Sequence, residues 1–294
     1  MNGAKILSIA AQRPARTMSN DELPGKFDID DAWIQSRTGI ATRGVANVEE
    51  TLVEMSAGAA SKAIAEAGID PATIDLTIVA TSSNPITTPG IAPPLTDRLG
   101  LTSGAFDIMA ACAGFCYSVN VAADSIRAGS ARNVLVVGAE RITDRMDWND
   151  RNTCYLFGDG AGAAIISATD VDDDGIGPVV WGSDGALADY IAQPMDSPYL
   201  QMDGQAVFKW AITELAGFAR EACEKAGIEP KDLAAFVPHQ ANLRIVESVA
   251  RNLGVRESTV VADDVRYSGN TSAASIPLAI SRMKEEGRIQ SGDS

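Results

Sequence analysis

Cys112 is the residue with the most direct potential for covalent chemistry. It ends the apolar run DIMAAC, which predicts a buried strand, and opens CAGFCYSVNVAADSIRAG, which has the spacing of a helix. A thiol at a helix start lies near unpaired backbone N–H groups, which favour the thiolate and lower the thiol pKa. The pattern predicts a nucleophile, although a free cysteine is often only a small buried hydrophobe. We interpret Cys116, Cys154 and Cys223 in that second way.

His239 is the only histidine of the chain and lies at the end of the apolar run LAAFVPHQ. Side chains that leave a sheet at the carboxyl end of a strand commonly form binding and catalytic sites. A lone histidine is more often structural, but Pro238 beside it argues against deep burial. Any acid, base or oxyanion-binding role for an imidazole in this chain therefore falls to His239.

Asn270 follows Ser268 and Gly269 at the head of a third predicted helix, within YSGNTSAASIPLAI. The small residues around it permit close approach of another element or a ligand. An asparagine at this place is equally typical of a helix N-cap. Both interpretations stay open from the local pattern.

The elements that must position these residues alternate between strand and helix, which predicts an α/β fold with covered sheets. Several predicted helices end in glycine, the usual C-terminal stop. The expected strands are 5–11, 75–83, 104–111, 133–140, 161–168, 177–183, 233–240 and 258–265. The expected helices are 51–68, 93–100, 112–129, 207–227, 242–254 and 270–287.

The two halves of the chain resemble each other. Residues 51–85 and 206–242 both read as a helix, the motif AGI-x-P and a strand that ends in a polar loop. Later in each half a strand leads into a helix, at Cys112 in the first and at Asn270 in the second. We expect halves at 1–168 and 176–294. After its third helix the first half has further strands that the second lacks, so we expect the second half to be incomplete at its C-terminus.

The composition argues against several classes of function. The 294 residues carry a formal net charge of −15, whereas nucleic acids and anionic membranes bind electropositive surfaces. Four cysteines without a CxxC pair and one histidine predict neither a metal site nor a disulfide framework. No apolar run is long enough to span a membrane and no signal pattern is present, so we expect a cytoplasmic protein. FGDGAGAAII lacks the nucleotide-loop patterns and predicts a tight turn.

Six segments in this order resemble the thiolase superfamily, specifically its type III ketoacyl synthases: WIQSRTGI, DIMAACAGF, NDRNTCYLFGDGAGAA, MDGQAVFKWAITELA, VPHQANLRI and SGNTSAASIPLAI. The resemblance implies two similar βαβαβαββ halves in five layers, normally in a homodimer. It implies a Cys112, His239 and Asn270 active site that condenses an acyl-CoA with malonyl-acyl carrier protein, without a cofactor. It also implies substrate-binding residues: Trp33 and Arg151 beside the CoA adenine, Arg37 near its phosphates, Gly204 along the pantetheine, and Leu156 and Phe157 in the acyl pocket.

A carrier protein is strongly acidic, so its docking on a chain of net charge −15 requires a local basic face. Arg244 and Arg251 lie seven residues apart in NLRIVESVARNLG and point the same way from a helix. Lys209, after MDGQAV, extends this predicted patch. The alternative is that all three are ordinary solvated charges.

Two departures from the family pattern limit the comparison. The segment NPITTPGIAPPLTDRLG replaces the usual loop that shapes the acyl pocket, and the two strands with a GFGxG turn that normally follow SGD are absent. The alternatives are another condensing enzyme of the superfamily or a non-catalytic subunit of a condensing complex. Thiolases need a second active cysteine, and the other relatives rely on a glutamate near the nucleophile. Residues 82–96 contain no glutamate.

Overall fold

A five-stranded mixed sheet forms the centre of the first half. The computed structural model describes residues 2–24 and 27–293. The strand order is β1 (Asn2–Gln12), β7 (Asp159–Asp170), β6 (Asn133–Arg141), β4 (Leu76–Ala80) and β5 (Gly104–Ile108). β7 is antiparallel to both β1 and β6, whereas β4 is parallel to β6 and to β5. The strands with few polar residues lie in the middle, as expected for a sheet covered on both faces.

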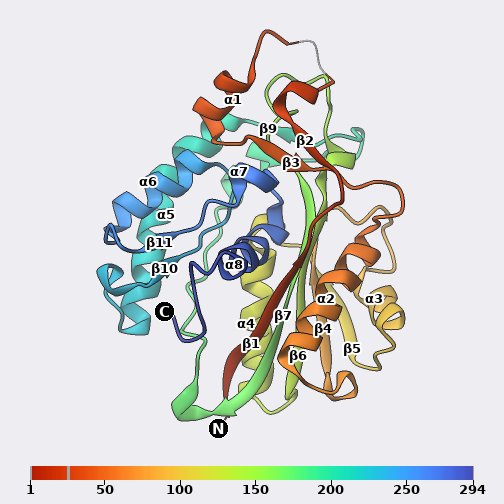
Figure 1. The fold of residues 1–294 in the computed structure, drawn as a ribbon, viewed down its shortest axis with the longest axis vertical. Coiled ribbons are helices and arrows are strands. Elements are labelled where there is room, and N and C mark those ends of the chain that lie inside the picture. Colours follow the sequence, from red (N-terminus) through yellow and green to blue (C-terminus); the bar gives the residue numbers. More distant parts are fainter. Residues whose placement is uncertain (1, 25–26, 294) are drawn as a thin grey trace.

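Helices cover both faces of this sheet (Figure 1). α2 (Leu52–Ala67) and α3 (Ala92–Leu99) pack on one face, and α4 (Gly114–Arg127) and α8 (Ser275–Glu285) pack on the other. The alternation along the strands decides this division, because Val79 and Leu135 face α2 while Ile78 and Val134 face α4. The first-half sheet and the helices predicted for it are thereby confirmed.

Local signals in the sequence explain where these helices begin and end. The Thr51 side chain accepts a hydrogen bond from the Glu54 N–H and caps α2, and Gly68 ends α2 with φ of 66°. Gly227 and Gly254 end the later helices in the same left-handed conformation. The predicted glycine stops are confirmed at these positions.

The second half contains less sheet. β10 (Ala235–Phe236) and β11 (Val260–Val261) pair in parallel, and α8 packs on one face of this pair. α5 (Gly204–Ala226) and α6 (Leu243–Leu253) pack together on the other side. From one side of the molecule to the other, the layers are helices, sheet, helices, sheet and helices (Figure 1). This is the predicted five-layered α/β fold.

The expected strand at 177–183 is wrong. The segment is irregular, and it lies alongside helices rather than beside β10 or β11. The Tyr117 hydroxyl donates to the Gly182 carbonyl at 3.1 Å, and the rings of Tyr117 and Trp181 lie 4.8 Å apart. Apolar residues in a run predict burial or contact, but a strand also needs a neighbouring strand to pair with.

Shorter elements lie outside these two sheets and their covering helices. They are β2 (Thr17–Ser19), α1 (Asp31–Thr38), β3 (Thr42–Gly44), β8 (Ile191–Ala192), β9 (Gln201–Met202) and α7 (Val265–Ser268). Two single turns of 3-10 helix, η3 (Ala111–Ala113) and η8 (Ser272–Ala274), precede α4 and α8. Across the described ranges, no helix has the length and apolar character needed to cross a membrane.

Candidate active site

Cys112 lies in the turn η3, between β5 and α4, rather than inside the predicted helix. The preceding Ala111 has φ of 44°, an uncommon conformation for a residue with a side chain, and this kink turns the chain from strand into helix. The Cys112 side chain is partly buried. Burial, with a smaller contribution from the nearby Glu140 charge, raises the pKa of its thiol to about 11. The pKa is therefore raised where the sequence pattern predicted a lowered one, because burial is the largest influence on this thiol.

Asn270 is held by backbone contacts from the first half. Its N–H donates to the Leu156 carbonyl at 2.8 Å, and its own carbonyl accepts from the Gly158 N–H at 3.1 Å. Its side-chain oxygen accepts from the Ser272 N–H at 2.9 Å. The N-cap residues are Thr271 for η8 and Ala274 for α8, so the interpretation of Asn270 as a helix N-cap is wrong. Its side chain instead closes a turn that precedes η8. The amide NH₂ group is left as the donor available to a ligand.

His239 follows β10 and is anchored to the first residue of α8. Its Nδ1 lies 2.7 Å from the Ser275 Oγ, and the neighbouring Gln240 N–H donates to the same hydroxyl at 3.3 Å. Burial lowers the pKa of His239 to about 4, so the imidazole is neutral near pH 7. When the Ser275 hydroxyl donates to Nδ1, the proton lies on Nε2, and the ring presents a donor away from α8.

The turn η8 brings the three predicted residues together. Asn270 lies just before η8, His239 is bonded to Ser275 just after it, and η3 with Cys112 packs against it. η8 also packs on β6, where a Cβ on Gly138 would lie 2.3 Å from the Ala273 carbonyl oxygen. Only a glycine in β6 permits this approach. The two halves of the chain therefore meet at the predicted active site.

Glu140 belongs to this site and was missed by the sequence analysis. It ends the buried part of β6, has none of its surface exposed, and accepts hydrogen bonds from the residues that follow β4. Residues 82–96 contain no glutamate, but Glu140 reaches Ser82 of that segment from the adjacent strand β6. The signal that could have found it is a single acid at the end of the otherwise apolar run NVLVVGAE.

Three residues predicted to bind CoA lie together at α1. The guanidinium carbons of Arg37 and Arg151 lie 5.5 Å and 5.2 Å from the centre of the Trp33 ring, and both arginines are exposed. The Trp33 ring packs edge-on against Tyr155, with 5.7 Å between ring centres. The arginines therefore lie against the indole, on the surface where a planar base could stack.

The predicted acyl-pocket and pantetheine residues lie in different surroundings. Phe157 is buried, contacts Ile142 and Met146, and pairs through its backbone with Asn270. Leu156 is partly buried between Trp33 and the residues near α6. Gly204 is exposed at the start of α5, where an added Cβ would meet the Met202 side chain at 3.4 Å. Phe157 and Leu156 thus adjoin Asn270, and Gly204 lies at the surface.

The predicted basic patch lies on α5 and α6. Arg244 is exposed with its guanidinium 5.1 Å from the Phe208 ring, and the neighbouring Lys209 is also exposed. Arg251 is exposed two turns further along α6, and the acidic Glu247 lies between the two arginines on the same face.

The three cysteines interpreted as packing residues differ in their exposure. Cys154 is buried as expected and Cys223 is partly buried. Cys116, in contrast, is exposed, so its interpretation as a packing residue is wrong.

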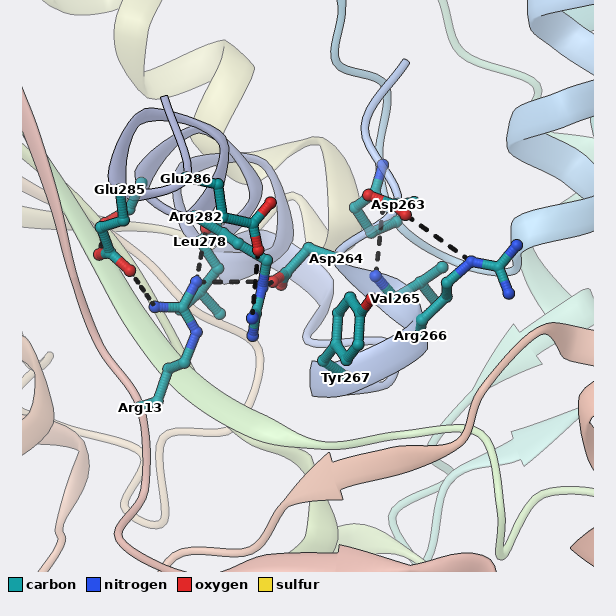
Figure 2. Close-up of polar contacts among 12 residues, drawn as sticks. Arg13, Asp263, Asp264, Val265, Arg266, Tyr267, Leu278, Arg282, Glu285 and Glu286 are labelled. Carbon is teal, nitrogen blue, oxygen red and sulfur yellow. Dashed lines mark hydrogen bonds and ion pairs between the residues drawn. The ribbon is translucent and has the colours of Figure 1, made fainter. Parts of the chain in front are cut away.

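A charged network holds the segment that leads into Asn270 (Figure 2). The buried Asp264 carboxylate accepts from Arg282 of α8, and Arg13 from the chain after β1 approaches it at 3.5 Å. The Arg282 guanidinium also lies 4.5 Å from the Tyr267 ring. Arg13 belongs to the first half and the other residues to the second, so the network joins the halves beside the turn that carries Asn270.

Comparison with known proteins agrees with this geometry. The family model for 3-oxoacyl-[acyl-carrier-protein] synthase III matches residues 106–185, and the model for its C-terminal region matches residues 223–294. Beta-ketoacyl-[acyl-carrier-protein] synthase III 4 of Streptomyces coelicolor is 46% identical over 99% of this chain and 92% of that relative. The synthase III of Mycobacteroides abscessus is 44% identical over 100% and 90%. The crystal structure of the priming beta-ketosynthase from the R1128 polyketide pathway has a TM-score of 0.95 and 42% identity, covering 99% and 90%.

The layered fold, with a cysteine, a histidine and an asparagine around the meeting of its halves, defines an acyl-condensing enzyme of the thiolase-like type. The matches extend through nearly the whole chain and well above the level at which only a fold is shared. The chain belongs to the beta-ketoacyl-[acyl-carrier-protein] synthase III family.

Proposed function

We propose that this protein condenses an acyl-CoA with malonyl-acyl carrier protein to give 3-oxoacyl-acyl carrier protein, and so initiates fatty-acid or related polyketide synthesis. The observation that carries the proposal is the turn η8, which places Cys112, Asn270 and the Ser275 anchor of His239 around one short segment. The names of the relatives, which include a priming ketosynthase, support the same reaction.

In the first half-reaction the Cys112 thiolate attacks the acyl-CoA carbonyl, the carbon–sulfur bond to CoA breaks, and the acyl group becomes a thioester on Cys112. The thiol must lose its proton first, because burial raises its pKa to about 11. The start of α4, directly after η3, then stabilises the negative sulfur through unpaired N–H groups.

In the second half-reaction malonyl-acyl carrier protein loses CO₂, and the resulting carbanion is stabilised as an enolate. A neutral His239 and the Asn270 amide supply two hydrogen-bond donors for the enolate oxygen. The carbanion attacks the acyl carbonyl on Cys112, the thioester bond to the enzyme breaks, and the 3-oxoacyl product leaves on the carrier. The substrates supply all the groups that react, and no cofactor is required in this scheme.

Trp33, Arg37 and Arg151 form the surface that would receive CoA. Its adenine would lie between Trp33 and Arg151, and Arg37 would lie beside the phosphates. Leu156 and Phe157 adjoin Asn270 and would line the acyl chain, while Gly204 would leave room for the pantetheine at the start of α5.

The acidic carrier protein would dock on Arg244, Arg251 and Lys209. The patch is exposed on the helices beside the His239 loop, and it is a local exception on a chain of net charge −15. Glu247 within it weakens the positive potential. The patch would therefore orient the carrier protein and increase its rate of association with the enzyme, and would contribute less to the affinity of the complex.

A homodimer is the expected assembly, formed along β5. This strand pairs with β4 on one side only, and Phe106 of β5 and Met109 directly after it have 40% and 83% of their surface exposed. A second copy paired along this edge would cover them. Within each copy, we place the halves at residues 1–168 and 176–294.

Intact-protein mass spectrometry after incubation with a panel of acyl-CoAs tests the proposal. We expect the mass of an acyl group on Cys112, from acetyl-CoA or a short branched acyl-CoA, and none in Cys112→Ala. Labelling on Cys116 instead would contradict the assignment of the nucleophile. Absence of labelling by every acyl-CoA would favour a non-catalytic subunit of a condensing complex.

The second substrate distinguishes the other condensing enzymes of the superfamily. Acylated protein is mixed in turn with malonyl-acyl carrier protein, malonyl-CoA and a second acyl-CoA, and the condensed product is identified by mass. We expect product with malonyl-acyl carrier protein. Product formed only with a second acyl-CoA would replace the proposal by a thiolase-like or head-to-head condensation.

A further inference from the structure

Ser275 is a buried serine at the first position of α8, and its hydroxyl lies against His239. It has 1% of its surface exposed, and its Oγ lies 2.7 Å from the His239 Nδ1. Serines in helices commonly bond to the backbone of their own helix. Here, among the described residues, both hydrogen-bond partners of the oxygen belong to the chain after β10. The side chain of Ser275 therefore serves that loop rather than its own helix.

The surroundings of this hydroxyl decide which group donates in its contact with His239. A serine hydroxyl can accept two hydrogen bonds but donates only one. The Gln240 N–H donates to the Ser275 Oγ at 3.3 Å, so the oxygen already acts as an acceptor. In the part of the chain that the structure describes, Nδ1 of His239 is the only acceptor within reach of the hydroxyl. Because a buried hydroxyl without an acceptor is costly, the hydroxyl donates and Nδ1 accepts.

The imidazole of His239 therefore carries its proton on the other nitrogen. Burial lowers the pKa of His239 to about 4, so the ring holds a single proton at pH 7. With Nδ1 accepting a hydrogen bond, that proton lies on Nε2. Across the described ranges Nε2 has no hydrogen-bond partner, and His239 is partly exposed. The Nε2–H group is thus left to donate to a ligand.

Gln240 fixes the loop that carries His239. It is completely buried, and both ends of its side-chain amide are occupied. Its Nε2 donates to the Pro238 carbonyl at 2.9 Å, and its Oε1 accepts from the Val265 N–H at 3.3 Å. Val265 begins α7, directly after Asp264 of the charged network (Figure 2). The N–H that orients the Ser275 hydroxyl therefore belongs to a residue with little freedom to move.

The same serine is joined to Asn270 through the turn η8. The Ser275 N–H donates to the Ser272 carbonyl, and the Ser272 N–H donates to the Asn270 side-chain oxygen at 2.9 Å. These bonds and the contact with His239 form one continuous path between the two residues proposed to bind the enolate oxygen. Each of those side chains uses its acceptor within the path. Each keeps a donor for the ligand, the amide NH₂ group of Asn270 and the Nε2–H group of His239.

We propose that Ser275 is a positioning residue that holds His239 in the Nε2–H tautomer and fixes the direction of this donor relative to the Asn270 amide. The inference rests on the proposed function, in which both donors meet the same enolate oxygen. Ser275 acts only through the imidazole and does not touch the substrate. Its hydroxyl keeps its own hydrogen, so no proton is transferred in this role.

The single histidine of the chain makes the tautomer directly observable. Protein without a histidine tag is labelled with ¹⁵N in the imidazole, and its NMR spectrum at pH 7 then contains only the two ring nitrogens of His239. The wild type should show a protonated Nε2 and an unprotonated Nδ1. In Ser275→Ala the two ¹⁵N signals should move toward each other, because part of the population takes the Nδ1–H tautomer. A protonated Nδ1 in the wild type, or an unchanged spectrum in Ser275→Ala, would overturn the inference.

The two half-reactions separate positioning from packing. Ser275→Ala should slow malonyl-acyl carrier protein decarboxylation about tenfold, roughly the effect of one lost hydrogen bond, and leave Cys112 acylation nearly unchanged. Ser281→Ala is the matched control. It removes another buried hydroxyl of α8, which donates to Glu285 at 2.8 Å, and it should alter neither half-reaction. Urea unfolding checks that both variants are folded, and the wild-type spectrum tests the tautomer even if one is unstable.

A double variant completes the test. In a His239→Ala background, Ser275→Ala should cause no further loss of decarboxylation, because the serine acts only through the imidazole. A further tenfold loss in that background, or an equal loss in acylation, would assign Ser275 to the packing of α8 and overturn the inference. Failure of the proposed function is a different result. The wild type would then form no condensed product with malonyl-acyl carrier protein, whichever tautomer the spectrum shows.

Discussion

The two halves of the molecule contribute to one site in different ways. The first half presents Cys112 and Glu140 from a five-stranded sheet that helices cover on both faces. The second half presents His239 and Asn270 from short segments that pack against the first half. The Asn270 backbone forms hydrogen bonds with Leu156 and Gly158 and none with the two-stranded sheet of its own half, among the described residues.

The geometry of the site is therefore set by contact between the halves. The nucleophile is positioned by the rigid sheet of the first half. The oxyanion donors are positioned by η8, which packs on β6 of that same sheet. Changes at the contact should therefore have larger effects than changes in the second half alone.

The largest effect is expected at Gly138. In Gly138→Ala the new methyl group would lie 2.3 Å from the Ala273 carbonyl oxygen, so η8 must move away from β6. We expect loss of about 3 kcal/mol of folding free energy, at the upper end for overpacking, together with nearly all condensation activity. Urea unfolding and a condensation assay check this. Unchanged activity would mean that η8 does not depend on its contact with β6.

The next effect separates the roles of the two halves in catalysis. His239→Ala and Asn270→Ala should each reduce malonyl decarboxylation by about 10²–10³-fold, because each removes one donor to the enolate oxygen. Acylation of Cys112 should fall far less. The half-reactions are timed separately, by CO₂ release and by intact mass. An equally steep fall in acylation in both variants would make His239 the base of the thiol.

Acid should destabilise the protein through His239. An unfolded chain binds the histidine proton below about pH 6.5, whereas the folded chain binds it only near its pKa of about 4. The free energy of unfolding therefore falls as the pH decreases from 6.5 to 4 and is unaffected by this group above 6.5. In His239→Gln, the decrease in the free energy of unfolding between pH 7 and pH 4.5 should be smaller than in the wild type by about 2 kcal/mol. Urea unfolding of both proteins at pH 7 and pH 4.5 measures it.

The difference between the variant and the wild type is the informative quantity. Burial raises the pKa of Asp159 to about 6, so this group stabilises the protein at low pH and has the opposite sign in the same window. Because both proteins contain Asp159, its contribution cancels in the comparison. An equal acid loss in both would refute the burial of a neutral His239.

A smaller effect is expected from the surface of the second half. Arg244→Glu should raise the KM for malonyl-acyl carrier protein about fivefold, equivalent to about 1 kcal/mol, and leave acylation by acyl-CoA intact. Lys231→Glu makes the same charge change at an exposed position outside the patch and serves as the control. Equal KM values for the two variants would reduce Arg244 to an ordinary solvated charge.

The smallest effect is expected in the middle of α5. Gly217 has no atom within 4 Å of an added Cβ, so Gly217→Ala meets no obstacle. The better helix propensity of alanine should stabilise the protein by about 0.5–1 kcal/mol without changing turnover. Thermal unfolding measures the gain. A loss of turnover would show that α5 is more closely coupled to the site than its packing indicates.

Much of the first half could be predicted from its sequence, because strands buried on two faces are apolar runs and helices end at glycines. The division into halves and the catalytic roles of Cys112, His239 and Asn270 stay predictions from the same pattern and from the family motifs. The segment 177–183 could not be predicted correctly, since its apolar residues contact Tyr117 and α5 instead of a strand. Pattern alone does not reveal which neighbour buries a residue.

The electrostatics of the site were the least predictable part. The helix start after Cys112 suggested a lowered thiol pKa, but the opposing burial and the charge of Glu140 come from elements far away in the sequence. Glu140 itself is found only when β6 is placed beside β4. Contacts of this kind depend on the register between strands, which a single sequence does not specify.

The left-handed backbone of Ala111 and Ser272 has a consequence for engineering. Both residues carry side chains at φ near 45°; Ala111 directly precedes Cys112, and Ser272 lies in η8, which packs against η3. Glycine would relieve the strain at either place, at about 1 kcal/mol each, while it would let the turn sample other shapes. A screen for heat-resistant variants would therefore select Ala111→Gly and Ser272→Gly. These variants would have a higher melting temperature but a slower turnover. In this part of the molecule, heat resistance is a misleading guide to a better enzyme.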